Sequence, residues 1–537
     1  MPYDSTKRSE VINQLQSLQF DILIIGGGIT GAGIALDAVS RGFKVALIEK
    51  QDFAAGTSSR STKLVHGGLR YLKNLEFKLV REVGLERAVA HRNAPHLVRP
   101  EKMLLPFVEG GSLGKFSTSM ALWLYDVLAG VKGDDKRKML SKSRTLDKEP
   151  LLKSEGLLGS GYYAEYRTDD ARLTLEVLKT ASKKGVKVIN YVSANSLIYN
   201  ENHVIGANCY NEITSGQFSI QAKFVVNATG PWVDELREKD HSLTKKRLHL
   251  TKGVHIVVPF NELPLQQSVY FDVGDGRMIF AIPRMDVTYI GTTDTSYEGD
   301  KTNPKVNKED VEYLLKAVNR MFTDINLEIK HVISSWVGLR PLIDEEGKSP
   351  SELSRADELF QSDSGLITIA GGKLTGYRLM AKKVVRLICD RLHITRKCKT
   401  RRIKLCGGEF RRTKEVINYK VKIGKKLLAM GLDKEKAFYL VHLYGKQTEK
   451  ILEILIDNSF KHLIEAEAFW AIHFEGAMTL IDFFARRTGK TLFEPMNIID
   501  EMDCVIKVFQ TQLNWNGSKI DFEQKMIFDK LKELRTF

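Results

Sequence analysis

Three glycines and one glutamate near the start of the chain have the spacing that dinucleotide binding requires. Gly26, Gly28 and Gly31 form the pattern G-x-G-x-x-G, and Glu49 follows at the end of the next apolar run. Gly26 would make a tight turn, Gly28 would let the backbone approach a pyrophosphate, and Gly31 would let a helix pack closely on a strand. Glu49 is placed to accept hydrogen bonds from ribose hydroxyls, and its negative charge disfavours a 2′-phosphate. The sequence therefore predicts a dinucleotide site.

These four residues need a strand, a helix and a second strand to position them. The apolar run 22–25 is typical of a buried strand, and the glycine pattern opens a segment rich in Ala, Ile and Leu that is typical of a helix. A second strand is predicted over residues 44–48, directly before Glu49. In that order the pyrophosphate would lie on the free N–H groups and the positive dipole end of the helix. A glycine triplet alone would be weak evidence, but the complete order of elements favours dinucleotide binding over a purely structural turn.

The composition is that of a globular protein with an unusually high positive charge. The chain has 537 residues, 43% of them hydrophobic and 27% charged, which suits two or three domains with substantial cores. Its formal net charge of +15 favours anionic partners, whether phosphorylated substrates, acidic lipid or nucleic acid.

The cysteines and the apolar runs indicate where the protein works. The five cysteines are scattered, with no C-x-x-C pair and no His/Cys spacing of a metal site, so we expect a reducing compartment and no bound metal. The first residues have no apolar core of signal-peptide kind, and no run approaches the roughly 20 apolar residues that span a bilayer. We therefore expect a cytoplasmic protein, or one attached to the inner face of a membrane.

One segment is richer in apolar and aromatic residues than its surroundings. FSTSMALWLYDVLAGV, residues 116–131, contains Trp123 and is flanked by Lys115 and Lys132. It is too short to span a membrane. Two interpretations stay open: a helix packed in a core, or a helix on a membrane surface, where aromatic groups favour the interface and lysines favour anionic headgroups.

Three later segments favour FAD over NAD as the dinucleotide. The segment after Glu49, QDFAAGTSSRSTKLVHGGLRY, is dense in glycine and small hydroxyl residues, which suits a backbone that lies close to a bulky cofactor. FVVNATG at 224–230 is a further strand that ends in a turn, as in flavoproteins of two-domain type. IAGGKLTGY puts another helix N-terminus where the pyrimidine edge of a reduced, anionic flavin could use its dipole. Each turn alone could be structural, but together they favour FAD.

Long motifs in sequence order make the chain resemble one family closely. They are the Ala94-Pro-His-Leu-Val element and IGGGITGAGIALDA, SSRSTKLVHGGLRYL, VNATGPWVD, KGVHIVVP, IGTTDTSYEGD, VGLRPL and GGKLTGYR. The chain is similar to the FAD-dependent, quinone-linked glycerol-3-phosphate dehydrogenases over nearly all of residues 20–390, and more weakly in its C-terminal part. The resemblance implies an α/β, two-domain flavoprotein fold, with a Rossmann-like FAD-binding domain, a mixed β-sheet substrate domain and a C-terminal helical domain.

The domain boundaries that we expect follow from this resemblance and from a change to helical, basic sequence near residue 400. After an N-terminal extension over 1–19, the FAD-binding and substrate-binding domains interleave over 20–400. Residues 401–537 form the basic helical domain. The FAD-binding segments are about 20–100, 165–235 and 355–395, and the substrate-binding segments are about 101–164 and 236–354.

The resemblance implies oxidation of sn-glycerol 3-phosphate to dihydroxyacetone phosphate, with the C2 hydride passing to flavin N5. The reaction needs a base for the proton of the C2 hydroxyl, and a histidine has an ordinary pKa of about 6.5 that suits proton abstraction. We expect His66 to be this base, with His255 as its rival or as a partner that orients substrate oxygens. Lys373 could contact a substrate oxygen or stabilise the reduced flavin by its charge.

Phosphate binding calls for guanidinium groups, whose planar fork meets phosphate oxygens in pairs. Arg340 and Arg355 match the positions where the family places phosphate-binding arginines, and Arg70 and Tyr71 could close the same pocket. With 81 Lys and Arg in the chain, only their motif positions distinguish these arginines from surface groups. The remaining FAD contacts that the resemblance implies are Thr57, Ser58, Thr62, Lys63, Leu64, Ala228, Gly230, Gly371, Gly372, Leu374 and Thr375.

The electron acceptor that the resemblance implies is a membrane quinone. The related oxidases, which use oxygen, carry an inserted segment in the substrate domain, and the short stretch between Arg340 and Arg355 leaves no room for one. We therefore expect a peripheral protein on the anionic inner face of the cytoplasmic membrane, with a homodimer as a possible assembly and no nucleic-acid partner. Two alternatives stay open: a related flavin oxidase that uses oxygen and acts on glycerol 3-phosphate or on amino or hydroxy acids, and a non-enzymatic basic binding protein that keeps the nucleotide fold.

Overall fold

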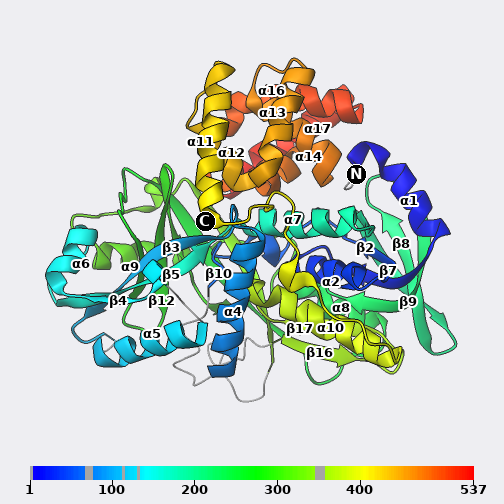
Figure 1. Cartoon of the computed structure of the whole chain (residues 1–537), viewed down its shortest axis with the longest axis horizontal. Coiled ribbons are helices and arrows are strands. Elements are labelled where there is room, and N and C mark those ends of the chain that lie inside the picture. The colour runs from blue at the N-terminus through cyan, green and yellow to red at the C-terminus, as the bar shows by residue number, and fades with distance from the viewer. Residues whose placement is uncertain (1–3, 67–76, 112–114, 130–132, 345–356) are drawn as a thin grey trace.

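The chain folds into two β-sheets with helices against their faces, and a third region made of helices (Figure 1). The α/β class predicted from the sequence, with its helical C-terminal region, is therefore confirmed. The computed structural model describes residues 4–66, 77–111, 115–129, 133–344 and 357–537.

The first sheet has a parallel centre. Its strands lie in the order β16-β17-β9-β1-β2-β6, and β7 and β8 extend it in antiparallel fashion from β9. β1 pairs in parallel with β2 on one side and with β9 on the other. In sheets of this kind, ligands bind beyond the carboxyl ends of the parallel strands. The strands are β1 (Gln19–Ile25), β2 (Val45–Ile48), β6 (Lys187–Ile189), β7 (Val192–Asn200), β8 (His203–Asn211), β9 (Gln217–Asn227), β16 (Asp357–Gln361) and β17 (Ile367–Gly371).

The apolar run in β1 fills two cores at once. Side chains alternate between the faces of a strand, so Ile22 and Ile24 join the core on one face while Leu23 and Ile25 join the core on the other. Helices α2, α7 and α10 cover the first face, and α1 with the strands β7 to β9 covers the second. A strand buried on both faces must be apolar throughout, which is why this run could be recognised in the sequence. The helices are α1 (Arg8–Ser17), α2 (Ile29–Ser40), α7 (Asp170–Lys183) and α10 (Tyr377–Arg391).

The second sheet is mixed and lies beside the first along the long axis of the molecule (Figure 1). Its strands lie in the order β14-β10-β13-β12-β11-β3-β5-β4, and β15 pairs with β10. α9 packs Val311 and Leu314 against one face, and α5 packs Leu122 into the core on the other. Its elements are β3 (Arg99–Val108), β4 (Lys138–Leu140), β5 (Leu157–Arg167), β10 (Leu248–Pro259), β11 (Ser268–Asp272), β12 (Met278–Arg284), β13 (Val287–Gly291), β14 (Thr295–Ser296), β15 (Ser334–Ile343), α5 (Lys115–Ala129) and α9 (Lys308–Met321).

The C-terminal region is helical and forms polar contacts with α7, which covers the first sheet, and with β15 of the second sheet. Arg172 of α7 forms a buried ion pair with Glu475 of α14 at 2.6 Å, and the hydroxyl of Ser335 in β15 donates to the carbonyl oxygen of Leu534 at 3.0 Å. These helices lie at the top of Figure 1. They are α11 (Thr413–Ala429), α12 (Lys436–Tyr444), α13 (Thr448–Asp457), α14 (Leu463–Glu475), α15 (Lys490–Phe493), α16 (Asn497–Leu513) and α17 (Gly517–Glu533).

Several elements lie close to where the sequence predicts: β2 is Val45–Ile48, against the predicted 44–48, and residues 116–129 of the apolar segment lie in α5. Asp169 caps α7 by accepting a hydrogen bond from the N–H of Arg172 at 3.0 Å. The domain boundaries that we expect from the sequence stay a prediction, because sheets alone do not define where a folding unit ends. The other helices are α4 (Phe77–Asn93), α6 (Lys142–Lys148) and α8 (Val233–Lys239).

Candidate active site

A cavity of about 1120 Å³ lies where the two sheets meet. The first sheet contributes residues at or just beyond the carboxyl ends of its parallel strands, such as Gly26, Glu49 and Gly371. The second sheet contributes residues of β10 and β15, among them His255 and Arg340. The cavity therefore joins the predicted nucleotide site to the residues predicted to handle the substrate.

The turn between β1 and α2 requires glycine at two positions. Gly26 has a φ of 117°, and a Cβ there would lie 2.4 Å from the carbonyl oxygen of Ala228. A Cβ at Gly31 would lie 1.9 Å from the carbonyl oxygen of Gly26. Gly28 precedes the first residue of α2 and lines the cavity. The turn thus brings bare backbone and a helix N-terminus to the cavity, as pyrophosphate binding needs.

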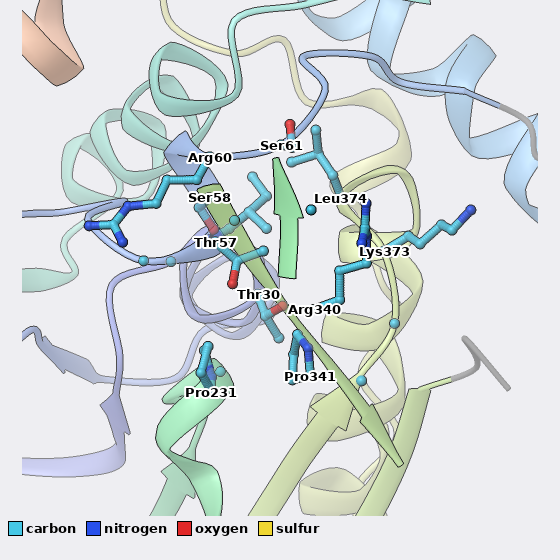
Figure 2. A pocket seen from close by; sticks show the side chains of 18 of the residues that line it. Thr30, Thr57, Ser58, Arg60, Ser61, Pro231, Arg340, Pro341, Lys373 and Leu374 are labelled. Atoms are coloured by element: carbon cyan, nitrogen blue, oxygen red, sulfur yellow. Dashed lines mark hydrogen bonds between the residues drawn. The ribbon is translucent and has the colours of Figure 1, made fainter. Parts of the chain in front are cut away.

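Thr57 and Ser58 tie this turn to the second sheet. The hydroxyl of Ser58 accepts a hydrogen bond from the N–H of Ile29 at 2.9 Å, and the hydroxyl of Thr57 donates to the carbonyl oxygen of Leu339 at 2.7 Å. Figure 2 shows both side chains at the cavity together with that of Thr30. The segment predicted to lie close to a bulky cofactor therefore does border the cavity.

Glu49 stands beyond β2 with its carboxylate held in place. One oxygen accepts from the N–H of Gly27 at 2.7 Å and the other from the N–H of Gln51 at 2.9 Å. Burial raises the pKa of Glu49, and these two hydrogen bonds act in the opposite direction without cancelling the rise. Each carboxylate oxygen can accept a second hydrogen bond, so contact with ribose hydroxyls stays a prediction that the geometry permits.

His255 is buried against Trp336 and touches the opposite wall. The two rings are parallel with centroids 4.6 Å apart, and Nε2 of His255 lies 2.9 Å from the hydroxyl oxygen of Thr62. Burial, followed by the positive charges of Arg340 and Lys63, lowers the pKa of His255 well below its ordinary value. The ring is therefore neutral at neutral pH, the state in which an imidazole can accept a proton.

His66 lines the same cavity and is half-buried. Its ring lies edge-on to that of Phe280 with centroids 6.4 Å apart, and Phe280 in turn stacks on Tyr270 at 4.0 Å. The carbonyl oxygen of His66 accepts a hydrogen bond from the hydroxyl of Thr375 at 3.2 Å. Both candidate bases thus belong to one site.

Arg340 is held rigidly at the cavity wall. Its Nη1 donates to the carboxylate of Asp294 at 3.1 Å, and its Nη2 donates to the hydroxyl of Thr292 at 3.0 Å. A Cβ at Gly253, on the neighbouring strand, would lie 2.2 Å from Nη2. Glycine at this position therefore makes the space that the guanidinium group occupies.

A double-glycine turn after β17 brings Lys373 to the cavity (Figure 2). Gly371 and Gly372 have φ values of 71° and 76°, in the left-handed region that glycine adopts without strain. Lys373, Leu374 and Thr375 follow and line the cavity before α10 begins. This is the late helix N-terminus that the sequence predicts near a flavin.

Most of the residues predicted for the site border the cavity. Gly31 and Lys63 are not among its lining residues, because Gly31 is packed under the turn and the Lys63 ammonium group pairs with Asp170 at 2.6 Å. Arg70, Tyr71 and Arg355 lie outside the described residues. Those that line it are Gly26, Gly28, Glu49, Thr57, Ser58, Thr62, Leu64, His66, Ala228, Gly230, His255, Arg340, Gly371, Gly372, Lys373, Leu374 and Thr375.

Some lining residues were not predicted from the sequence. The ammonium nitrogen of Lys50 lies 4.2 Å from the centroid of the Trp232 ring, and both residues border the cavity. Arg60 also borders it (Figure 2), and burial followed by repulsion from Arg486 lowers its pKa to about 10. Both stand in motifs that the sequence shows, Trp232 in VNATGPWVD and Arg60 in SSRSTKLVHGGLRYL, so a signal was present for each.

These residues fit FAD. The glycine backbone and the N-terminus of α2 suit a pyrophosphate, the carboxylate beyond β2 suits a ribose, and the turn into α10 suits a flavin edge. Among the described residues, no group of three or more His, Cys, Asp or Glu side chains is placed to hold a metal ion.

The family model described as FAD dependent oxidoreductase matches residues 21–378, and that of the C-terminal domain of alpha-glycerophosphate oxidase matches residues 398–520. Fold and site therefore define an FAD-dependent oxidoreductase.

Individual relatives narrow this class. The chain is 49% identical to the aerobic glycerol-3-phosphate dehydrogenase of Bacillus subtilis, with 96% of this chain and 95% of the relative covered. It is 46% identical to the enzyme of the same name from Staphylococcus aureus, with 99% and 98% covered. It is also similar to the crystal structure of the glycerol-3-phosphate dehydrogenase from Bacillus halodurans complexed with FAD, at 40% identity and a TM-score of 0.86, with 99% and 98% covered. The chain belongs to the family of FAD-dependent, aerobic glycerol-3-phosphate dehydrogenases, as its sequence motifs predict.

Proposed function

We propose that the protein oxidises sn-glycerol 3-phosphate at C2 to dihydroxyacetone phosphate and passes the electrons to a membrane quinone. One observation carries the substrate half of this proposal: a single cavity joins the glycine turn to His66, His255, Arg340 and Lys373. The names of the relatives support the same substrate, because each is a glycerol-3-phosphate dehydrogenase.

The protein's part in the oxidation is to take a proton from the C2 hydroxyl. FAD, when bound, supplies N5 as the acceptor of the C2 hydride. His255 suits the proton transfer because its ring is neutral, buried and fixed between Trp336 and Thr62. His66 is the rival base, since it borders the same cavity beside Phe280. We assign one of the two histidines as the base and the other to orienting substrate oxygens.

Arg340 and Lys373 are the cations that we assign to the substrate. Arg340 shares its charge with Asp294, which fixes the direction of the guanidinium group but weakens its net field. A phosphate dianion therefore needs a further cation, and Lys373 borders the same cavity. Arg355, Arg70 and Tyr71 keep their predicted roles in phosphate binding as proposals.

We infer that α5 brings the protein to a membrane, where a quinone is found. Met120, Trp123 and Val127 are 56%, 53% and 58% exposed, and their spacing places them on one face of the helix. Met120 and Leu124 also border the cavity, so the exposed apolar face adjoins the site. None of the helices in the described ranges is long and apolar enough to cross a membrane. Peripheral binding to an anionic surface also suits the net charge of +15.

The experiment that tests the substrate is an anaerobic absorption spectrum before and after addition of glycerol 3-phosphate. We expect a flavin spectrum that is bleached by this substrate. A flavin that stays oxidised, but is bleached by an amino acid or a 2-hydroxy acid, would keep the fold and overturn the substrate. Absence of flavin after reconstitution with FAD would overturn the cofactor assignment as well.

Oxygen is the second candidate acceptor, because the C-terminal family model is named for an oxidase. Reoxidation of the substrate-reduced protein distinguishes the two. We expect reoxidation by a soluble quinone analogue to be much faster than by dissolved oxygen. Rapid formation of hydrogen peroxide from oxygen, with slow reaction of the quinone analogue, would make the protein an oxidase.

A further inference from the structure

The segment Ser61–Lys63 connects the two walls of the cavity at His255. The hydroxyl oxygen of Thr62 lies 2.9 Å from Nε2 of His255. The other ring nitrogen, Nδ1, has no hydrogen-bond partner among the described residues. The orientation of the imidazole therefore depends on Thr62 for its polar contact and on stacking against Trp336 for the rest.

This segment has a backbone that needs external support. Lys63 has a φ of 57°, in the left-handed region that residues other than glycine seldom adopt. Its side chain is almost fully buried, with 3% of it exposed. A buried ammonium group on a left-handed residue persists only where surrounding groups hold it.

Asp170, the first residue of α7, supplies that support. It is fully buried, and its Oδ2 accepts from the N–H of Ser61 at 2.9 Å and from the hydroxyl of Ser61 at 2.6 Å. Its Oδ1 accepts from Nζ of Lys63 at 2.6 Å and from the N–H of Ala171 at 3.0 Å. One carboxylate thus holds the residues on both sides of Thr62.

Two side chains of the second sheet also form hydrogen bonds with the segment Ser61–Lys63. Nε1 of Trp336 donates to the carbonyl oxygen of Ser61 at 3.1 Å, and the hydroxyl of Tyr289 donates to the carbonyl oxygen of Thr62 at 3.3 Å. These two bonds fix the carbonyl groups of Ser61 and Thr62, while Asp170 fixes the N–H and the hydroxyl of Ser61 and the ammonium group of Lys63. Of the partners named here, Asp170 alone binds both Ser61 and Lys63 by side-chain atoms.

We propose that Asp170 is a positioning residue for the oxidation: its carboxylate holds Ser61 and Lys63 so that Thr62 orients His255 toward the substrate. This rests on the proposed function, in which His255 takes the proton or orients a substrate oxygen. Asp170 itself touches neither, since it is not among the residues that line the cavity. Its effect should appear in the rate of the chemical step and spare substrate affinity, because a misplaced reacting group slows a reaction that still binds its substrate.

The test compares Asp170→Asn with a matched control, Asp37→Asn. Asp37 of α2 also forms a buried ion pair, with Arg41 directly after that helix, and does not line the cavity. In anaerobic stopped-flow reduction by glycerol 3-phosphate, we expect Asp170→Asn to lower the limiting rate by about 100-fold, with FAD content and substrate Kd unchanged. Asp37→Asn should lower the thermal midpoint by a similar amount and leave the limiting rate at the wild-type value. Asp170→Glu should recover part of the rate.

A second measurement does not depend on activity. Hydrogen exchange of the peptide that contains Ser61–Lys63 should be faster in Asp170→Asn than in the wild type, because the single amide oxygen of asparagine cannot accept from both Ser61 and Lys63. If Asp170→Asn does not fold, Lys63→Met replaces it in both measurements, with effects in the same direction, because it leaves the left-handed backbone at residue 63 without its ion pair to Asp170.

The outcomes separate this proposal from the function on which it rests. If the wild-type flavin is not reduced by glycerol 3-phosphate, the proposed function fails and this inference fails with it. Equal limiting rates in the wild type and Asp170→Asn, or unchanged exchange of the peptide, would overturn the positioning role alone. A loss of FAD in Asp170→Asn but not in Asp37→Asn would overturn it too, since Asp170 would then serve cofactor retention.

Discussion

The two walls of the cavity differ in which atoms form them: one is built mainly from backbone atoms and the other mainly from side chains. The wall from the first sheet is mainly backbone at its glycine turn, because a Cβ at Gly26, or at Gly31 packed beneath the turn, would collide with a backbone carbonyl oxygen. The wall from the second sheet is mainly side chain: His255 is held by Thr62 and Arg340 by Asp294, each from another segment of the chain. A backbone wall is determined by local sequence, whereas a side-chain wall depends on which distant segments meet. We therefore expect changes in the first wall to remove the cofactor, and changes in the second wall to spare the cofactor and slow the reaction.

The largest effect is expected in the backbone wall. Gly31→Val would put a branched side chain where even a Cβ lies 1.9 Å from the carbonyl oxygen of Gly26. We expect purified protein with no bound FAD, and hence no turnover, together with a lower thermal midpoint, because the collision is with backbone and exceeds the ordinary cost of overpacking, about 1–3 kcal/mol. The flavin content measured by absorbance, together with a thermal unfolding curve, checks this. Gly517→Ala, with nothing within 4 Å of its Cβ, is the control and should keep FAD. Normal flavin content in Gly31→Val would contradict the account of this wall.

The next largest effect is expected in the side-chain wall. Removing a cation that binds a buried anion costs about 2–5 kcal/mol, so Arg340→Ala should lower kcat/KM by roughly 30-fold to several thousand-fold. Gly253→Ala should act in the same direction, because its Cβ would lie 2.2 Å from Nη2 of Arg340. Steady-state kinetics with glycerol 3-phosphate measure both variants, and both should retain FAD. If either variant lost its flavin, the two walls would not be separable and the comparison would fail.

The difference between a local backbone turn and a long-range side-chain contact also explains which parts of the site could be predicted from the sequence. The glycine turn could be recognised, because Gly26, Gly28 and Gly31 lie within a few positions of one another. The contact between His255 and Thr62 joins residues 193 positions apart, and no local pattern announces it. Lys63 was predicted to contact the cofactor from its motif, yet its ammonium group turns to Asp170, a partner that only the folded chain brings near.

A smaller effect concerns pH and distinguishes the two candidate bases. Burial and then the charges of Arg340 and Lys63 lower the pKa of His255 well below 6.5. A base acts when it is deprotonated, so with His255 as base the limiting rate of flavin reduction should stay constant from pH 8 to about 6.5. It should fall only at lower pH, about tenfold per pH unit below the pKa. Stopped-flow reduction across this range measures the profile. Arg340→Gln, which removes one of the lowering charges, should move the acid limb to higher pH. An acid limb centred at or above 6.5 in the wild type, lost in His66→Gln, would assign the base to His66 instead.

The smallest effect is expected on the outer face of the second wall, where side chains of α5 meet solvent and the cavity at once. Trp123 is 53% exposed, so Trp123→Ser removes only part of the 1.5–3 kcal/mol that fully burying a large apolar side chain contributes, and we expect binding to anionic liposomes to weaken by up to about tenfold. Sedimentation with liposomes at low and high salt measures this, and the rate of flavin reduction in solution should stay unchanged. Met285→Ser, equally exposed at 54% in a turn of the same sheet, is the matched control and should bind as the wild type does.

The competing membrane face is α11, where Leu428 is 65% exposed on a helix rich in lysine. Binding that is lost in Leu428→Ser and kept in Trp123→Ser would move the membrane contact to the C-terminal helices, and would leave the apolar face of α5 as an extension of the cavity wall.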